Sequence, residues 1–419
     1  MKISTTTYPA ETLKPGFINK IARKLVQQRL VDIQGAMIEI QDPIETWYAG
    51  HGDKADIIIS VKNLDFYSEV MFSGSKGAAA AYRDGMWTSS DLVKLLRIMT
   101  RNIDLLDGFE SGSAKIMNLI NSLTHRARSN TRSGSKKNIH AHYDLGNDMF
   151  KVFLDPTMTY SCGIFPDKKA SLEQASIEKL DTICRKLNIG PEDHVVEIGT
   201  GWGSFAIHAA SRYGCNVTTT TISQDQHELA QSRIKEAGLE DKITLLLSDY
   251  RDLNGKFDKL VSIEMIEAVG DDHLGEYFSK CASLVKQDGQ LLIQAITMPD
   301  RRYAQYLKRS DFIQQFIFPG SCVPSLTAMM NYISGHTDLR VENIENIGPH
   351  YADTLNQWHE NFMGNTDKIR SLGYSNEFIK LWQYYLCYCE AGFREKYLGT
   401  LHLHLSRPGY DVPDIKDSK

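Results

Sequence analysis

The sequence predicts an α/β protein: a doubly wound parallel sheet with helical insertions, plus a smaller α+β domain at the N-terminus. Strand and helix patterns alternate from residue 147 onward, and the first of these strands runs into a glycine-rich turn. Residues 1–122 mix strand-like and helical runs but contain no such turn. Strand–helix alternation at this spacing is typical of a parallel sheet covered by helices on both faces.

The alternating region can be assigned element by element. Short β-branched and apolar runs predict strands over residues 193–198, 216–222, 242–247, 257–263 and 290–296. Apolar residues at helical spacing predict helices over residues 204–213, 224–236 and 272–285. The C-terminal part is rich in helical patterns and closes with an alternating strand over residues 400–406.

The N-terminal region begins with a basic amphipathic stretch, residues 17–30 (FINKIARKLVQQRL), and contains a strand-like run at residues 55–61. We weigh two interpretations of the first stretch. It is either a helix that lies on a membrane surface or, as we favour, a helix packed on its own domain with a solvated basic face. A polar, basic segment follows at residues 123–142. It reads as a solvated linker or as a site for anionic phospholipid head groups, which contribute about 1 kcal/mol per basic side chain.

Composition narrows the class of protein. At 419 residues the chain is long enough for two or three domains. Its net charge of −5 argues against a surface built for nucleic acid, so we predict no nucleic-acid partner. Seven scattered cysteines predict free thiols in a reducing compartment. Without a signal-peptide pattern or an apolar run long enough to span a bilayer, we expect a cytoplasmic protein. The oligomeric state is not determined, and a homodimer is left open.

The glycine-rich turn lies in residues 195–203 (VVEIGTGWG), where a buried strand meets the start of a helix. Glycines here let the backbone approach a ligand closely. Dinucleotide sites carry G-x-G-x-x-G and an acid about 20 residues further on. In this chain the third glycine comes one residue early, the second strand ends without a carboxylate, and an acid, Glu197, lies inside the first strand. This pattern resembles that of class I methyltransferases, which bind S-adenosylmethionine, a ligand whose ammonium and sulfonium charges a carboxylate can balance.

Motifs on both sides of the turn make the resemblance specific. They are HYDLGNDMF at residues 142–150, MTYSCGIF at 158–165, EMIEAVG at 264–270, FIFPG at 316–320 and YYLCYCEAGF at 384–393. Together they resemble the cyclopropane-fatty-acyl-phospholipid synthase family, which includes the mycolic acid cyclopropane synthases, over about residues 138–410. The resemblance implies a lipid- or membrane-associated N-terminal domain at 1–122, the basic linker at 123–142, a catalytic domain at 143–410 and a tail at 411–419.

The implied reaction is methylene transfer to the cis double bond of an acyl chain in a membrane phospholipid. The π bond attacks the methyl group of S-adenosylmethionine, and a base, in the family a bound bicarbonate, deprotonates the carbocation so that a cyclopropane ring closes. The implied location is peripheral, at the inner face of the cell membrane, with the phospholipid bilayer surface as partner. The alternatives are a methyl- or methylene-branched product and, more remotely, a non-catalytic lipid-binding protein.

The resemblance also implies a bicarbonate cradle. Its residues are Cys162, Glu267 and Tyr351, the backbone of Ile296, and Gln294. Many bacterial members have histidine where this chain has Gln294 and Ala268, whereas plant-type synthases look similar to this chain at both positions. Glutamine bonds an anion but does not exchange a proton near neutral pH, so a proton relay at position 294 is in question.

The residues implied for S-adenosylmethionine come from both sides of the turn. They are Tyr143, Tyr160, Ser161, Glu197, Gly199, Gly201, Gly203, Thr221, Ile222, Gln226, Tyr250 and Arg251. Tyr250 and Arg251 are expected beside the adenine, and the choice between Tyr160 and Tyr250 stays open. His402 and His404 share one face of the last strand, but they lack a third ligand at a recognisable spacing, so we predict no metal site.

Overall fold

The computed structural model describes residues 16–110 and 146–411, which divide into two compact units. The first unit contains residues 16–91 and 102–110, and the second contains residues 92–101 and 146–411. The predicted basic linker at 123–142, the predicted ligand residue Tyr143 and all but the first residue of the 411–419 tail lie outside the described residues.

The first unit is an α+β arrangement around a four-stranded sheet of order β2-β1-β3-β4. Its strands are β1 (Met37–Gln41), β2 (Thr46–Gly50), β3 (Ile57–Val61) and β4 (Trp87–Ser89). The β1–β3 pair is parallel, whereas β1–β2 and β3–β4 are antiparallel. The helices are α1 (Phe17–Leu30), α2 (Asp65–Arg83) and α4 (Ile103–Glu110). The strand predicted over residues 55–61 corresponds to β3.

Helix α1 packs on its own domain, as we favoured from the sequence, but through a different face. Its buried residues are Ala22 and Val26, and Arg23 is held inward by Asp42 at 2.7 Å and Glu45 at 2.9 Å. The larger apolar side chains face outward instead, namely Phe17, Ile18, Ile21 and Leu25. The expected solvated basic face is therefore found only in part: Lys20 and Lys24 are exposed, whereas ion pairing draws Arg23 inward and small residues make the contact with the domain.

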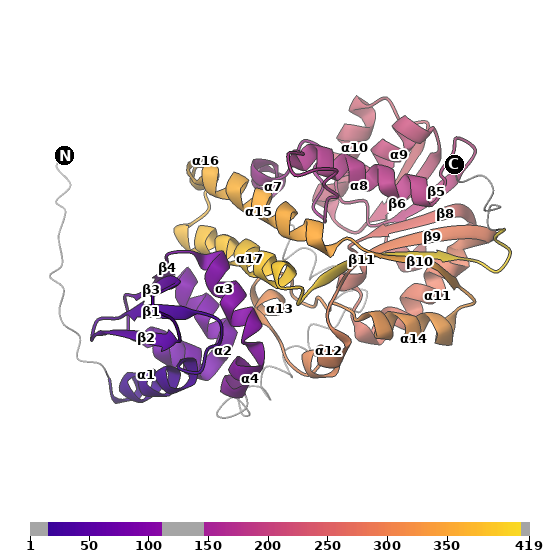
Figure 1. Ribbon diagram of the computed structural model, residues 1–419. Coiled ribbons are helices and arrows are strands. Elements are labelled where there is room, and N and C mark those ends of the chain that lie inside the picture. Colours follow the sequence, from indigo (N-terminus) through magenta and orange to yellow (C-terminus); the bar gives the residue numbers. More distant parts are fainter. Residues whose placement is uncertain (1–15, 111–145, 412–419) are drawn as a thin grey trace, which may run out of the picture. The chain divides into compact units, whose positions relative to one another are not determined.

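The second unit is built on a seven-stranded sheet of order β10-β11-β9-β8-β5-β6-β7 (Figure 1). Its strands are β5 (His194–Ile198), β6 (Asn216–Thr221), β7 (Ile243–Leu247), β8 (Phe257–Ile263), β9 (Val285–Thr297), β10 (Arg340–Asn346) and β11 (Gly399–Ser406). Strands β9, β8, β5, β6 and β7 are parallel to their neighbours in that series.

The sheet differs from the prediction at one edge, where β11 runs antiparallel to β9 and β10 runs antiparallel to β11. The sheet is therefore mixed rather than wholly parallel. All seven residues of β10 are exposed, so this strand has none of the alternation by which a strand is recognised in sequence. Its charged side chains are typical of an edge strand, where they discourage pairing with another chain.

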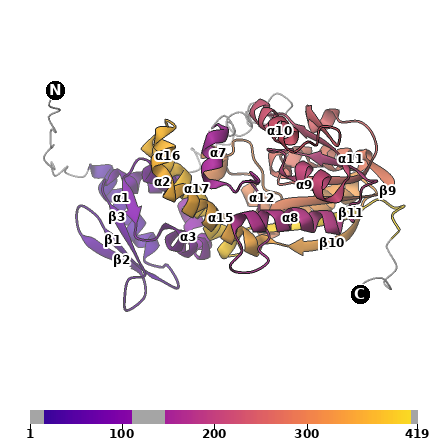
Figure 2. The same ribbon diagram turned by 90° about the horizontal axis from the view of Figure 1, so that it is seen from above.

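Helices cover both faces of this sheet. On one face, α8 (Leu172–Lys186), α9 (Ser204–Tyr213) and α10 (Gln224–Glu236) contribute to a core that contains Val195. On the other face, α11 (Leu274–Leu284) and α14 (Leu326–His336) pack around Val196. Figure 2, the view from above, shows α8 and α9 in front of the sheet. Helices α9 and α10 have the predicted bounds, whereas α11 starts two residues after the predicted position because a 3-10 turn, η3 (Asp271–His273), precedes it.

The remaining helices of the second unit extend beyond the sheet. They are α3 (Leu92–Arg101), α7 (Asn147–Phe153), α12 (Asp300–Tyr306), α13 (Phe312–Phe316), α15 (Gly348–Gly364), α16 (Thr366–Ser371) and α17 (Asn376–Arg394). Helices α15 and α17 pack side by side (Figure 1). Helix α3 belongs to this unit although it lies within the first 122 residues, and its Arg97 and Arg101 each donate to Glu395 at 2.6 Å. None of the described helices has the length and apolar character needed to cross a membrane.

Candidate functional site

The glycine turn follows β5 and leads directly into α9. Gly199, Gly201 and Gly203 have φ angles of 99°, 52° and 88°, which residues with a side chain rarely adopt. A Cβ atom at Gly199 would lie 3.2 Å from the Met265 side chain, whereas one at Gly201 would meet no atom within 4 Å. The turn is therefore packed against the protein at its first glycine and open at its second, as a ligand-binding turn requires.

Glu197 lies inside β5 and is 2% exposed. Its Oε2 atom accepts a hydrogen bond from Thr219 Oγ1 at 2.6 Å, and Thr219 also bonds Thr200 at 2.7 Å. Burial raises the pKa of Glu197 to about 8. A cationic ligand near the turn would favour the ionised carboxylate, so this acid fits the charge of S-adenosylmethionine.

The predicted residues after the second strand form a local hydrogen-bonded group. Thr221 ends β6, and its Oγ1 donates to Gln226 Oε1 at 2.9 Å. Ser223 caps α10 by accepting from the Gln226 backbone N–H, and half-buried Ile222 lies between strand and helix. These contacts fix the Gln226 amide at the start of α10, at the carboxyl edge of the sheet, where α/β proteins bind their ligands.

Tyr250 and Tyr160 have different surroundings. Tyr250 lies on η1 (Tyr250–Asp252) after β7, with the Arg251 guanidinium 5.6 Å from the centre of its ring. Asp249 holds that guanidinium at 2.7 Å. Tyr160 belongs instead to an aromatic cluster formed by Phe150, Phe153, Tyr160, Trp358, Phe362, Trp382 and Tyr385. Its hydroxyl group bonds that of Tyr385 at 2.9 Å.

A buried lysine that we did not predict lies beside Ser161. Lys179 is 1% exposed, and its Nζ donates to Ser161 Oγ at 2.8 Å. Burial lowers the pKa of Lys179 to about 8, opposed mainly by the charge of Glu264. The sequence did carry a signal: in α8, Lys179 falls among the buried positions Leu172, Ala175, Ser176, Leu180 and Ile183, where an unpaired charge is unfavourable.

Three of the residues predicted for the anion cradle, Cys162, Gln294 and Tyr351, meet at a second residue that we did not predict, Glu264. Its Oε1 accepts from the Cys162 backbone N–H at 2.9 Å and from Gln294 Nε2 at 2.7 Å. Its Oε2 accepts from the Tyr351 hydroxyl at 2.7 Å. Burial raises the pKa of Glu264, and these three hydrogen bonds oppose that rise. The Cys162 thiol instead faces the Gly163 and Ile347 carbonyls at 3.3 and 3.7 Å.

Glu267, the carboxylate that we did predict, lies three residues further on in η2 (Ile266–Ala268), next to Ala268. Its Oε1 accepts from the Ile296 backbone N–H at 2.5 Å, and its buried Oε2 has no hydrogen-bond partner among the described residues. Burial, together with the charge of Glu264, raises the pKa of Glu267 to about 8. At neutral pH Glu267 is therefore mainly the neutral acid, whereas the three hydrogen bonds donated to Glu264 favour its ionised form.

The Gln294 amide is oriented by His402, which lies on the last strand, β11. Its Nε2 donates to Glu264 and its Oε1 lies 3.0 Å from His402 Nε2, while Lys186 Nζ lies 2.8 Å from His402 Nδ1. His404 lies 2.8 Å from a different amide, Gln290 Oε1. The two histidines that we weighed as a metal pair thus bond separate glutamines. Among the described residues, no cluster of histidine, cysteine and acidic side chains could hold a metal ion.

These contacts allow a test of the bicarbonate that the resemblance implies. The Cys162 N–H, the Tyr351 hydroxyl and the Gln294 amide are all bonded to Glu264, and the Ile296 N–H is bonded to Glu267. Their hydrogen bonds are thus directed at protein carboxylates. Another anion beside this pair would add like charge in a buried site, which is unfavourable. The residues of this chain therefore do not fit a bound bicarbonate.

Glu264 could have been found from the sequence. It directly follows β8, and acids at the carboxyl end of a parallel strand face the ligand edge of such sheets. The family resemblance singles out the second acid of the EMIEAVG motif, Glu267, and not the first.

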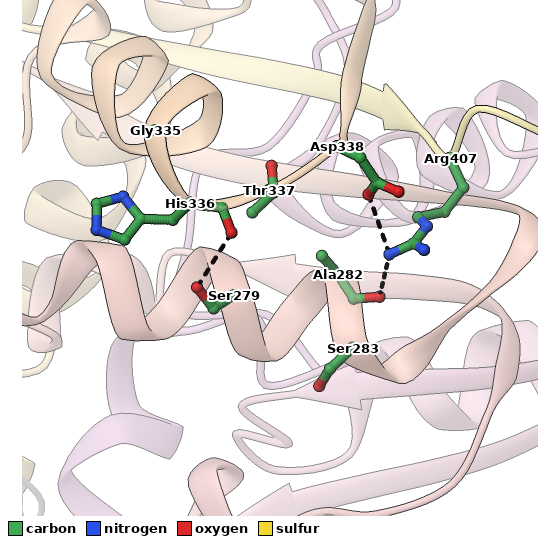
Figure 3. Close-up of a pocket in the computed structure, with 8 residues that line it drawn as sticks. All are labelled: Ser279, Ala282, Ser283, Gly335, His336, Thr337, Asp338 and Arg407. Atoms are coloured by element: carbon green, nitrogen blue, oxygen red, sulfur yellow. Dashed lines mark hydrogen bonds and ion pairs between the residues drawn. The ribbon is translucent and has the colours of Figure 1, made fainter.

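A pocket elsewhere in the second unit is unrelated to these residues. Figure 3 shows it between α11 and the end of α14, with Ser279 bonded to the His336 carbonyl. Arg407 donates to the Ala282 carbonyl at 3.0 Å and pairs with Asp338 at 3.1 Å. None of the predicted site residues lines this pocket.

Comparison with known proteins agrees with the geometry of the turn and of the sheet. Residues 130–403 match the family model described as mycolic acid cyclopropane synthetase. The chain is 38% identical over 347 residues to tuberculostearic acid methyltransferase UfaA1 of Mycobacterium tuberculosis, a match that covers 80% of each protein. It is 34% identical over 387 residues to the cyclopropane-fatty-acyl-phospholipid synthase of Escherichia coli, which covers 88% of this chain and 96% of that one.

A solved structure extends the likeness to the fold. Mycolic acid cyclopropane synthase CmaA1, complexed with SAH and CTAB, matches with a TM-score of 0.61 at 30% identity, covering 65% of this chain and 98% of that one. The predicted class I methyltransferase fold is thereby confirmed. With a glycine turn suited to the cofactor and a family match over most of its length, this chain belongs to the mycolic acid cyclopropane synthetase family of S-adenosylmethionine-dependent methyltransferases.

Proposed function

We propose that the enzyme transfers a methylene group to the cis double bond of unsaturated acyl chains in membrane phospholipids, forming a cyclopropane ring. One observation carries the proposal. Met265, which directly follows the cradle acid Glu264 and lies two residues before Glu267, packs against Gly199, where an added Cβ would approach it to 3.2 Å. The turn that would hold S-adenosylmethionine is therefore directly adjacent to a buried carboxylate pair. Methyl transfer followed by proton abstraction requires this adjacency.

When bound, S-adenosylmethionine supplies an electrophilic methyl group, which the alkene attacks to leave a positive charge on the acyl chain. The residues around the cradle suit such a charge. Tyr351 stacks on Phe393 with ring centres 4.4 Å apart, and Trp358 lies 6.0 Å from Tyr351. Aromatic faces attract cations, and a site lined by buried aromatic rings limits the water that would otherwise quench a carbocation.

For access to lipid, the proposal assigns a membrane role to the 1–122 domain. On α1, Phe17 is 79% and Ile18 59% exposed, and the neighbouring Lys20 and Lys24 are exposed as well. A helix with outward apolar side chains flanked by lysines can lie in the interface of an anionic bilayer. We therefore propose peripheral association with the inner face of the cell membrane.

Substitutions on α1 test this role. Phe17→Ser combined with Ile21→Ser should weaken partitioning onto anionic vesicles and lower turnover on vesicle lipid. Affinity for S-adenosylmethionine should stay the same, because the cofactor residues lie in the second unit. Ile44→Ser serves as the matched control, since Ile44 is 49% exposed but lies outside α1. Equal partitioning of the double variant and the control would contradict the assignment.

A second candidate function is a methyl- or methylene-branched product. Two observations favour it: the relative with 38% identity is named a tuberculostearic acid methyltransferase, and Gln294 provides no exchangeable proton near neutral pH. Cyclopropane and methylene products have the same mass, so the test is the proton NMR spectrum of the lipid product. High-field ring protons would support the cyclopropane, and new olefinic methylene protons would support the branched product.

A further inference from the structure

The cradle presents a protein carboxylate at the place where the family is expected to hold a small anion. Both Glu264 oxygens are engaged, one by the Cys162 N–H and Gln294 and the other by the Tyr351 hydroxyl. A carboxylate and a bicarbonate offer hydrogen-bond donors the same planar pair of oxygens. We propose that the Glu264 carboxylate, rather than a bound bicarbonate, is the base that removes the proton after methyl transfer. This inference rests on the proposed function.

The backbone of Glu264 gives an independent reason. Its φ angle is 49°, in the left-handed region that residues other than glycine, asparagine and aspartate seldom adopt. Such strain persists where the surrounding structure holds the residue in place, and it concentrates at functional sites. Here the strained backbone directs a half-buried carboxylate at three converging hydrogen-bond donors, at a position where glycine would be free of strain.

The neighbouring side chains orient the Glu264 carboxylate and favour its ionised form, which is the form that can accept a proton. Because Gln294 donates through Nε2, its Oε1 must accept, so His402 carries its hydrogen on Nε2 and accepts from Lys186 at Nδ1. Burial and the charge of Lys186 keep the pKa of His402 low, in line with a neutral ring. His402 is therefore a positioning residue that fixes the Gln294 amide, and neutral Glu267 leaves Glu264 as the one anion of the pair.

The proposed step balances without a further reactant. The alkene π electrons form a bond to the methyl carbon, and the methyl–sulfur bond breaks with its electrons remaining on sulfur. Glu264 then takes a proton from that methyl group, and the released C–H electron pair forms the last ring bond. In the branched alternative a hydride shift comes first, and the same electron pair forms the exocyclic double bond. Glu264 ends as the carboxylic acid and returns its proton to solvent before the next turnover.

The experiment measures turnover of full-length enzyme on unsaturated phospholipid vesicles, in buffer purged of carbon dioxide and again with added bicarbonate. Wild-type turnover should change less than twofold between the two buffers. Glu264→Gln should lose at least 100-fold in turnover, the range expected for a lost general base, with unchanged affinity for S-adenosylmethionine. Glu264→Gly should lose as much, bind ¹³C-bicarbonate by NMR line broadening where wild type does not, and recover activity with bicarbonate or acetate.

Glu390→Gln is the matched control, a buried acid of α17 that is bonded to Arg394 at 2.6 Å. It should create no bicarbonate requirement. Wild-type turnover that collapses without bicarbonate and returns with it would overturn the assignment, whether or not the variants fold. Glu264→Gln with wild-type turnover would also overturn it. If wild type forms no methylated lipid in either buffer, the proposed function fails, an outcome distinct from a bicarbonate requirement.

Discussion

Replacing Glu267 by glutamine should stabilise the protein by an amount that grows with pH. In the folded state burial and Glu264 raise the pKa of Glu267 to about 8, from an ordinary value of 4.5. The folded protein thus keeps a proton that the unfolded chain releases above pH 4.5. Each pH unit between these two values therefore lowers the free energy of unfolding by about 1.4 kcal/mol. The glutamine side chain of the variant does not ionise, so the variant lacks this loss.

The size of the effect follows from the two pKa values. The stability gap between Glu267→Gln and wild type should widen from near pH 4.5 and level off above pH 8. The total change is about 5 kcal/mol, of which about 3 kcal/mol is reached by pH 7. A constant offset from burying an amide in place of an acid does not alter this slope. A buried acid that does not contribute to the Glu267 shift, such as Glu197, titrates in both proteins and cancels in the difference.

The assay is denaturant unfolding of both proteins at several pH values between 5 and 8.5. Glu173→Gln is the control, because Glu173 is an exposed acid in the first turn of α8, and its gap should stay small throughout. A Glu267→Gln gap that is independent of pH would mean that Glu267 ionises normally. It would refute the one-anion description of the cradle.

Three further predictions concern the cofactor, the packing of α3 and the membrane. Glu197→Gln should weaken S-adenosylmethionine binding about tenfold or more in calorimetry, because a charged hydrogen-bond partner is lost; equal affinity would remove Glu197 from the site. Glu395→Gln should cost about 1 kcal/mol at pH 7 and progressively less as the pH falls below 4.5. The reason is that Arg97 and Arg101 lower the pKa of Glu395, so its stabilisation is present above pH 4.5 and lost in acid; no change at pH 7 would show that these contacts contribute nothing. Vesicle binding should weaken as salt rises, since charges are screened beyond about 8 Å, and should depend less on salt when five basic residues are neutralised. These five are Arg126, Arg128, Arg132, Lys136 and Lys137.

The elements around the glycine turn could be predicted closely because each carries its own local signal. Helix α10, for example, begins after the Ser223 cap and repeats its apolar residues at helical spacing. The antiparallel edge could not be predicted in this way, since β10 is exposed throughout and its pairing with β11 is long-range. The orientation of α1 was misjudged because the Arg23–Asp42 ion pair is not evident from a helical repeat.

Most residues of the site were predicted from the sequence, but the hydrogen bonds between them were not. The family resemblance implied Cys162, Gln294 and Tyr351, yet nothing local indicates that all three bond Glu264, which lies 102 residues from the first and 87 from the last. The resemblance also implied the family's bicarbonate. A match between sequences identifies equivalent residues, but it does not show which hydrogen bonds those residues make in this chain. Glu264 itself has a signal in the sequence, but that its side chain occupies the hydrogen-bond donors of the cradle is visible only in three dimensions.

The central claim is methylene transfer to an unsaturated lipid, and an isotope experiment tests it most directly. Purified enzyme is incubated with unsaturated phospholipid vesicles and S-adenosylmethionine whose methyl group carries ¹³C and three deuterons, and the acyl chains are analysed by mass spectrometry. We predict acyl chains that contain the labelled carbon with two of its three deuterons, since a base removes the third. Acyl chains without label, or with all three deuterons retained, would contradict the account.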